Sequence, residues 1–363
     1  MSVAYVLEQN ASINREGERL IIKKGGAVLH ALHAFKLDQL ILFGNVALTP
    51  QALSFLLQNK VDTVFMTLNG RYRGRLQPPL SKNIPLRCAQ FQRMGEPEFC
   101  LDLARSIIAG KIANMRTVLL RLNRSREGLA LDDHILSLKQ LGIKLADAQD
   151  MDALRGYEGR CTALYFEGFS RGFRAEGVTF AKRVRRPPTD PVNALLSLGY
   201  ALLFNTVLAA VSLVGFDPYL GALHSVEYGR PSLALDLMEE WRPLIVDALV
   251  LSIFNLRALS LNDFVSGKID EEDLEDGRPG DVEDEAGLVQ ESPEEPSRGL
   301  PVKLTDSGFR KFVTQFERKM GEKVRHHLTG QQMSYRDCIR EQVRGLARYV
   351  RGEETSYKPM LVK

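Results

Sequence analysis

Short apolar runs separated by polar turn residues make up most of the first 80 positions of the chain. The runs are residues 2–7, 19–23, 38–43 and 61–66. The last two are of the buried-strand type and are followed by Gly-Asn and Asn-Gly turns, of which Asn-Gly is a typical hairpin turn. Residues 50–58 between them have the spacing of a short amphipathic helix. This pattern predicts a small β-rich domain over residues 1–80.

Helical periodicity replaces the strand pattern after Pro85. Apolar residues then recur at three- and four-residue spacings, as on the buried faces of helices, in long stretches joined by short loops. The helices predicted in this way are residues 98–123, 130–141, 151–169, 191–214, 233–259, 305–319 and 335–351. The expected fold class is therefore α+β: a small N-terminal β-rich domain, a linker at residues 81–85 and a larger all-α domain at residues 86–363.

Residues 191–216 contain no charged side chain, and this segment is long enough to cross a membrane. Basic residues precede it, as they do many membrane spans. However, Asn193, Asn205 and Ser212 lower its hydrophobicity, and no second span follows. A central helix that is buried on all sides has the same composition. We favour the buried helix and expect no membrane association.

The bulk composition places the chain among globular proteins. Its 363 residues are enough for two or three domains, and 44% hydrophobic with 26% charged residues is typical of a folded chain. The four cysteines include no Cys-x-x-Cys pair, which argues against a zinc ribbon or a disulfide scaffold. The first residues do not have the layout of a signal peptide, so we expect a cytoplasmic protein.

The net charge of +3 conceals an uneven distribution. Thirteen acidic and two basic residues lie between Asp270 and Arg298, which leaves 46 basic and 32 acidic residues, a balance of +14, in the rest of the chain. Residues 267–299 are predicted to be an acidic, solvated, flexible insertion, with mimicry of nucleic acid or shielding of a basic surface as the alternative. A basic protein body favours phosphate-bearing partners such as nucleic acid.

A histidine and two carboxylates lie close together in the sequence after a loop rich in proline and glycine. His224 follows this loop, and Asp236 and Glu239 come next in a helical pattern. Because positions three apart share a helix face, both acids can point toward one site. Glu158 stands ahead of an apolar run near the start of another predicted helix. Carboxylate oxygens with an imidazole nitrogen suit Mg²⁺ or Mn²⁺, and the imidazole favours Mn²⁺.

Each of these residues also has an ordinary structural explanation. Glu158 can be a helix-start acid, Glu239 a solvated helix residue and His224 a core histidine bonded to backbone. The combination of residue types, however, meets the needs of phosphodiester chemistry. A bound Mg²⁺ or Mn²⁺ lowers the pKa of a coordinated hydroxyl and neutralises the charge that builds on phosphoryl oxygens.

Several segments, in the same order along the chain, resemble one protein family. The segments are FGNVALT at 43–49, NGR at 69–71, YEGRCTALYF at 157–166, DPVNALL at 190–196, GFDPYLGALH at 215–224 and SLALDLMEEWRP at 232–243. Together they resemble the CRISPR-associated spacer-acquisition integrases over nearly the whole chain. The resemblance implies an N-terminal β domain that dimerises and a larger helical catalytic domain. It also implies a metal-dependent DNA endonuclease of prokaryotic antiviral defence.

The resemblance assigns roles to single residues. It implies that Glu158, His224 and Glu239 are the catalytic metal ligands. Asp236 matches a further acid of the family, which orients a ligand or binds the metal itself. Arg242 follows Glu239 by three positions, so it is an auxiliary residue that pairs with this acid or reaches a phosphate.

Aromatic and basic residues in and after the Glu158 helix are candidates for the surroundings of the site. Tyr165, which recurs in the family segment, is expected to pack or to hydrogen-bond near the reacting phosphate. The candidate DNA-binding residues are Arg171, Arg174, Lys182, Arg183, Arg185 and Arg186, with phenylalanines interleaved. They would contact the DNA backbone and position it rather than specify its sequence, although a plain surface loop explains the same run.

The family implies a definite reaction. A homodimer would work with a small ferredoxin-like companion protein on double-stranded and branched DNA. It would join the 3′-hydroxyls of foreign DNA fragments to the CRISPR repeat array by transesterification. Two alternatives stay open: a structure-specific repair nuclease that acts on branched DNA with water as the nucleophile, and a DNA-binding scaffold whose acids are structural. The presence of every expected ligand type favours an enzyme.

Overall fold

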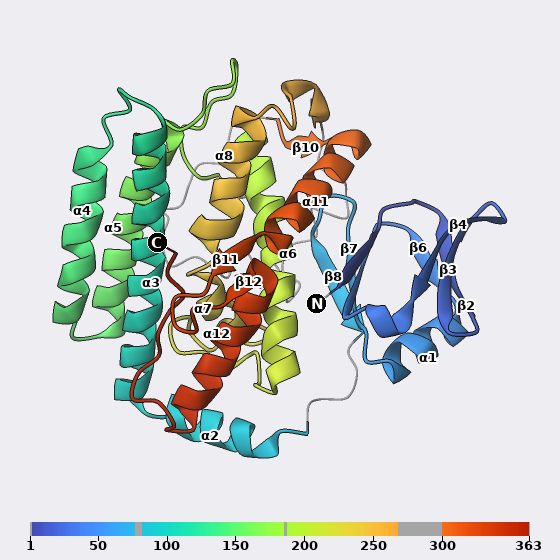
Figure 1. Ribbon diagram of the computed structural model, residues 1–363, viewed down its shortest axis with the longest axis horizontal. Coiled ribbons are helices and arrows are strands. Elements are labelled where there is room, and N and C mark those ends of the chain that lie inside the picture. Colours follow the sequence, from blue (N-terminus) through green and yellow to red (C-terminus); the bar gives the residue numbers. More distant parts are fainter. Residues whose placement is uncertain (1, 77–81, 185–186, 268–299, 363) are drawn as a thin grey trace. The chain divides into compact units, whose positions relative to one another are not determined.

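The computed structural model describes residues 2–76, 82–184, 187–267 and 300–362 (Figure 1). The described chain divides into two compact units, one up to residue 82 and one that begins at Asn83. Strands make up most of the first unit, between residues 3 and 76, and helices make up most of the second. The α+β class predicted from the sequence is confirmed. The predicted acidic insertion lies, apart from residue 267, outside the described residues.

The N-terminal unit contains two four-stranded sheets. In one, the strand order is β1 (Val3–Val6), β5 (Gln39–Phe43), β7 (Asp62–Met66) and β8 (Tyr72–Leu76). In the other, the order is β4 (Ala27–His33), β3 (Arg19–Lys24), β2 (Ala11–Glu16) and β6 (Val46–Leu48). Helix α1 (Pro50–Gln58) begins at Thr49, whose hydroxyl accepts the N–H of Ala52 at 3.3 Å. The apolar runs predict α1 and strands β1, β3, β5 and β7, but not the other four strands.

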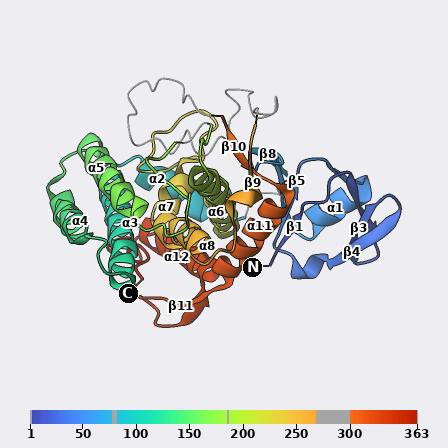
Figure 2. The same cartoon turned by 90° about the horizontal axis from the view of Figure 1, so that it is seen from above.

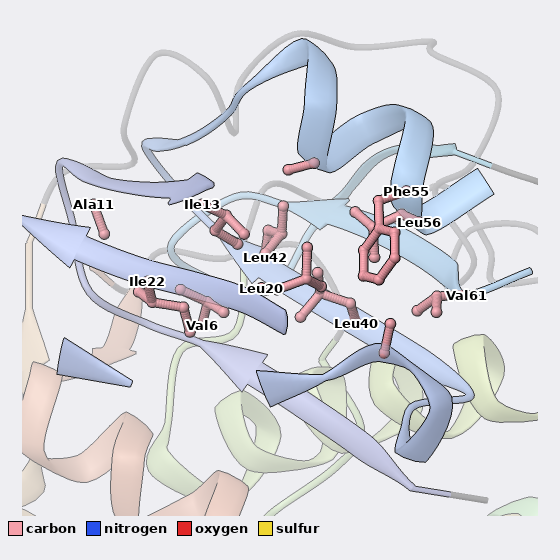
Figure 3. Packing of buried hydrophobic residues seen from close by; sticks show 12 residues of the cluster. Val6, Ala11, Ile13, Leu20, Ile22, Leu40, Leu42, Phe55, Leu56 and Val61 are labelled. Carbon is pink, nitrogen blue, oxygen red and sulfur yellow. The ribbon is translucent and has the colours of Figure 1, made fainter. Parts of the chain in front are cut away.

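The two sheets and α1 share one hydrophobic core (Figure 3). Ile13 of β2 and Leu20 of β3 enter it from one sheet, and Leu40 and Leu42 of β5 enter it from the other. Phe55 of α1 joins the same cluster. Along β2, buried and partly exposed residues alternate, as they must when one face of a strand meets the core.

Helices form most of the second unit. They are α2 (Ile84–Met94), α3 (Pro97–Ser125), α4 (Asp132–Lys144), α5 (Met151–Ser170), α6 (Pro191–Val214), α7 (Ser232–Met238), α8 (Ala248–Asn255), α11 (Asp306–Gly321) and α12 (Tyr335–Val350). Two short antiparallel ladders accompany them: β9 (Phe264–Ser266) with β10 (Val302–Leu304), and β11 (Lys323–Arg325) with β12 (Gln332–Ser334). Helical periodicity gives no sign of these ladders or of α2. Helix α2 begins inside the predicted linker, because Pro85 is accommodated in its first turn.

Helix α6 is the centre of the helical unit. Figure 2 looks nearly along its axis and shows α7, α8 and α12 around it. Asp190 caps its first turn by accepting the N–H of Asn193 at 2.8 Å, and Gly215 ends it at a φ of 108°. Within the described residues it is the one helix that is long and apolar enough to cross a membrane, and 89% of its apolar window is buried. The favoured sequence interpretation, a buried core helix, accounts for its composition.

The helix predicted at residues 233–259 is broken, which corrects the sequence interpretation. Helix α7 ends before Glu239, a π-helical turn follows at Pro243–Asp247, and α8 continues from there. Pro243 has no N–H to donate and its ring crowds the preceding turn, so a regular α-helix does not run through this point. Glu239 therefore lies at a helix break and not inside a regular helix.

Candidate functional site

The three predicted metal ligands come from three separate parts of the helical unit. Glu158 lies in α5, His224 lies in the loop that follows α6, and Glu239 lies at the break after α7. Their exposed fractions are 2%, 2% and 1%. Carboxylates with so little access to water need a cation or hydrogen-bond donors beside them.

Lys111 of α3 supplies a positive charge to both acids. Its ammonium donates to Oε1 of Glu158 and lies 2.5 Å from Oε2 of Glu239. Burial disfavours the charged ammonium, but the attraction of the two carboxylates outweighs burial and raises the pKa of Lys111. The hydroxyl of Thr162, one turn along α5, donates to the same Glu158 oxygen at 2.8 Å. One lysine thus links two acids that are distant in the sequence.

Glu239 is held in its ionised form. Burial alone would raise the pKa of this carboxyl, but the charges of Lys111 and Arg242 are the main contributions that outweigh burial and lower the pKa to about 2. Nε of Arg242 lies 3.2 Å from Oε1 of Glu239, so the ion pair foreseen for Arg242 is present. The Arg242 guanidinium also lies 4.6 Å from the centre of the Tyr200 ring, at cation–π distance.

Asp236 fixes the orientation of His224. Its Oδ1 lies 2.6 Å from Nδ1 of the imidazole, and its two oxygens accept the backbone N–H groups of Ala222, Leu223 and His224 at 2.6, 3.0 and 2.9 Å. Gly221 permits this approach, because a Cβ there would lie 2.6 Å from Oδ2 of Asp236. With Nδ1–H donating to the carboxylate, Nε2 keeps its lone pair for another partner. Asp236 therefore orients the histidine, one of its two predicted roles.

Three buried acceptor atoms of the site have no hydrogen-bond donor. They are Oε2 of Glu158, Nε2 of His224 and Oε2 of Glu239, one from each predicted ligand. The 2.5 Å contact of Lys111 with Glu239 is an ion pair without the geometry of a directed hydrogen bond, which explains why that oxygen is in the set. Carboxylate oxygens and an imidazole nitrogen are the donor set that Mn²⁺ or Mg²⁺ accepts. The atoms therefore fit a divalent cation in chemical type.

Their present spacing is not that of a loaded metal site. In the part of the chain that the structure describes, no three acid, histidine or cysteine side chains stand in ligand geometry. The ammonium of Lys111 lies between the two carboxylates instead.

Asp247 forms a second polar group next to the site. The hydroxyls of Tyr165 and Tyr200 donate to its two oxygens at 2.9 and 2.6 Å, and all three side chains are buried. Burial raises the pKa of Asp247 to about 6, because the tyrosine hydrogen bonds and the charges of Arg242 and Lys111 offset burial only in part. Tyr165 thus packs in the interior and hydrogen-bonds a protein carboxylate, and its auxiliary role at the reacting phosphate stays a prediction.

Sequence reasoning missed Lys111 and Asp247. Each is the one charged residue in an otherwise apolar stretch, Lys111 within residues 107–113 and Asp247 within residues 244–255. A lone charge inside a buried helix needs a partner from another helix. That signal was present in the sequence, but it does not name the partner.

The predicted DNA-binding residues divide into exposed and internal ones. Arg171, Arg174 and Lys182 are exposed, and the two arginines donate to backbone carbonyls between residues 125 and 130. Arg183 is half-buried and donates to the Asn193 and Ser197 side chains of α6 at 2.9 and 3.0 Å. Its guanidinium therefore holds the preceding loop to α6. Two further candidates, Arg185 and Arg186, lie outside the described residues.

The interleaved phenylalanines pack against one another. Phe169 and Phe180 are buried, and their ring centres are 5.5 Å apart at an interplanar angle of 82°. Phe173 contacts both of these rings. Phe169 and Phe180 therefore lie in the interior, the half-buried Phe173 packs against them, and the exposed cations of the segment lie at Arg171, Arg174 and Lys182.

Comparison with known proteins decides the family. The family model described as CRISPR associated protein Cas1 matches residues 4–271 of this chain. The chain belongs to the Cas1 family. The CRISPR-associated endonuclease Cas1 3 of Thermus thermophilus is 35% identical over 365 residues, which cover 100% of this chain and 98% of that relative. The family predicted from the ordered segments is confirmed, and with it the class of CRISPR-associated endonuclease.

Solved structures share the fold of this Cas1 protein. A casposase bound to integration product gives a TM-score of 0.80 at 23% identity, with 99% of this chain and 93% of that chain covered. A chain of a Cas6-RT-Cas1–Cas2 complex gives 0.79 at 24% identity, with 99% of this chain and 36% of that chain covered. The likeness supports the order of regions seen here, an N-terminal β region followed by a mainly helical one.

Proposed function

We propose that this Cas1 endonuclease uses Glu158, His224 and Glu239 to hold Mg²⁺ or Mn²⁺ and joins the 3′-hydroxyls of foreign DNA fragments to the repeat array. The observation that carries the proposal is the set of three buried acceptor atoms, one from each residue, that have no hydrogen-bond donor. Oε2 of Glu239 has the Lys111 ammonium beside it, whereas Oε2 of Glu158 and Nε2 of His224 are buried acceptors without a donor, which are costly and uncommon. One divalent cation would be a partner for all three. Membership of the Cas1 family supports the same assignment.

The joining step is an in-line displacement at phosphorus. The fragment's 3′-oxygen forms a bond to phosphorus, the bond to the 3′-oxygen of the array strand breaks, and the hydroxyl proton ends, through solvent, on that leaving oxygen. When bound, the ion supplies a Lewis acid that favours loss of this proton and stabilises charge on the phosphoryl oxygens. Asp236 holds the Nδ1 side of the His224 ring, so Nε2 is the ring nitrogen that would face the ion. Arg242 places a guanidinium beside Glu239, where a phosphate oxygen can accept from it.

The proposed partners follow from charge and from the resemblance. Double-stranded and branched DNA are the substrates, and the balance of +14 outside the acidic segment suits them. Arg171, Arg174 and Lys182 are the proposed contacts to the DNA backbone. A homodimer formed through the N-terminal domain, a small ferredoxin-like companion and a prokaryotic cytoplasmic location follow from the family resemblance. A Cas6-RT-Cas1–Cas2 complex among the structural neighbours supports a companion protein.

A strand-transfer assay tests the proposal. A labelled duplex with 3′-hydroxyl ends is offered to a plasmid that carries a repeat array, with Mn²⁺ or EDTA and with the companion protein. We expect Mn²⁺-dependent joining at the repeat edge, lost by a factor of at least about 10³ in Glu158→Gln, His224→Ala and Glu239→Gln. Asp152→Asn, an acid of the same helix whose side chain is 92% exposed, is the matched control and should join normally.

Two results would change the assignment. Wild-type joining rates in Glu158→Gln would remove this residue from the metal site. Mn²⁺-dependent nicking of branched DNA without joining, even with the companion protein, would favour the repair nuclease that uses water as the nucleophile.

A further inference from the structure

Lys111 takes the place between two carboxylates that a shared metal ion needs. Its ammonium hydrogen-bonds Glu158 and lies 2.5 Å from Oε2 of Glu239. We propose that Lys111 is a built-in counter-ion, which occupies the metal position in the metal-free protein and leaves it when a divalent cation binds. The inference rests on the proposed metal site and adds to it a residue that the cation must displace.

Burial explains why the metal-free site needs an internal cation. Glu158 and Glu239 are at most 2% exposed, and two buried carboxylates without a counter-charge strongly destabilise a fold. Lys111 supplies that charge from α3, so the fold of the site does not depend on the metal. The same contacts oppose metal binding, because an incoming cation must break both ion pairs.

A displaced ammonium would not be left isolated. Lysine carries its charge on a flexible four-carbon stem, so small rotations move the ammonium away from the carboxylates. The buried carboxylate of Asp247 is near enough to interact with the charge of Lys111. A phosphate oxygen of bound DNA is a further partner of the right charge. Lys111 would thereby exchange protein carboxylates for DNA as the site is loaded.

A salt bridge with only a structural role predicts the opposite change in metal affinity when Lys111 is removed. If Lys111 served only to hold α3, α5 and the α7 break together, its removal would loosen the two carboxylates. Metal affinity would then fall or stay unchanged. Removal of a competing counter-ion should instead raise the metal affinity, since the metal then has no ammonium to displace and only Arg242 stays paired with Glu239. The direction of the change in affinity separates the two roles.

Isothermal titration of Mn²⁺ into wild-type protein and Lys111→Met tests the proposal, because methionine keeps an unbranched stem and removes the charge. We expect Lys111→Met to bind Mn²⁺ at least about tenfold more tightly than the wild type. The variant should also melt at a lower temperature in EDTA, and Mn²⁺ should raise its melting temperature by more than that of the wild type. Lys311→Met is the matched control, since Lys311 pairs with Asp263, and it should bind Mn²⁺ as the wild type does. Equal or weaker binding by Lys111→Met overturns the inference.

The outcomes also separate this inference from the metal site on which it rests. No Mn²⁺ binding by the wild type rejects the metal site itself, whereas wild-type binding without the gain in Lys111→Met rejects only the counter-ion. If Lys111→Met does not fold in EDTA, Lys111→Gln takes its place in the same titration, because glutamine keeps an N–H donor for the carboxylates and removes the charge. Mn²⁺ binding by Lys111→Gln that is no tighter than that of the wild type contradicts displacement.

Discussion

The charged side chains buried around the site differ in the kind of partner that holds them. Glu239 lies beside the ammonium of Lys111, and its pKa falls to about 2. Asp236 accepts backbone amides and the His224 ring. Asp247 has two tyrosine hydroxyls, which donate hydrogen bonds but bring no charge, and its pKa stays raised at about 6. Asp247 is therefore expected to change protonation in mildly acidic solution.

Asp247 should make stability depend on pH between about 4 and 6. Burial raises the pKa of this carboxyl from 3.8 to about 6, so the folded protein binds the proton more tightly than the unfolded chain does. The resulting stabilisation is complete below the unfolded pKa and is lost as the pH rises through the folded pKa, by at most about 3 kcal/mol. Asp247→Asn has no such proton. The free energy of unfolding of Asp247→Asn relative to wild type, from urea titrations across this range, should therefore increase with pH.

An exposed acid provides the control for this experiment. Asp152→Asn changes a side chain that is 92% exposed, and its stability relative to wild type should stay constant over the same range. A constant difference between Asp247→Asn and wild type would contradict the raised pKa of Asp247.

Among the elements of the helical unit, hydrophobic periodicity located the long helices but not their interruptions. The segment from α7 to α8 is buried on all sides, so its apolar pattern continues across the break, and Pro243 is the one local signal. The start of helix α2 was assigned to the linker at residues 81–85, because Pro85 is as typical of a loop as of the first turn of a helix. Strands β9 to β12 have three residues each, too few to show a period of two.

The segment after α12 is an element that no periodic pattern reveals. The Tyr357 hydroxyl donates to Oε1 of Glu240 at 2.9 Å, and the N–H of Met360 donates to Oε2 at 2.8 Å. The amide of Asn114 in α3 donates to the backbone carbonyls of both Glu240 and Met360. The end of the chain is thereby tied to the residue that follows Glu239.

Tyr357→Phe should lower the free energy of unfolding by about 1–3 kcal/mol. The change removes a donor from the buried carboxyl group of Glu240 and an acceptor from the amide of Gln342, which donates to this hydroxyl at 3.0 Å. Urea titration measures the effect. Tyr219→Phe, at a tyrosine that is 52% exposed, should stay within about 0.5 kcal/mol of wild type. Equal stabilities of the two variants would show that the Tyr357 hydrogen bonds contribute nothing to the fold.

For the whole molecule, the sequence was sufficient for the family and the fold class, and the residues of the proposed metal site stay a prediction. Glu158, His224 and Glu239 stand in segments whose order is visible along the chain, and the structure brings all three into the buried interior of the helical unit. Their partners could not be predicted in the same way. Lys111 meets the two acids because α3 packs against α5 and α7, and tertiary packing of this kind leaves no spacing rule in one sequence.

The charge distribution of the whole chain predicts DNA binding that depends on salt. A protein with a balance of +14 outside its acidic segment should release counterions from DNA, so the logarithm of the binding constant falls linearly with the logarithm of salt concentration. Replacement of three exposed cations with glutamine, at Arg171, Arg174 and Lys182, should reduce the magnitude of that slope by about 2 to 3 for any DNA sequence. Binding constants measured by fluorescence anisotropy at several salt concentrations give the slope for each protein.

Two further variants test whether the change in this slope is specific to the proposed DNA contacts. Replacement of Lys139 and Lys144, exposed lysines of α4, tests whether any loss of positive charge has the same effect, and we expect a smaller change. Glu158→Gln should keep the wild-type slope while it loses strand joining, because the ligand acts on the reacting phosphate and not on the backbone contacts. If the triple variant keeps the wild-type slope, the DNA backbone lies on another surface, and the residues after α5 serve only to hold their loop.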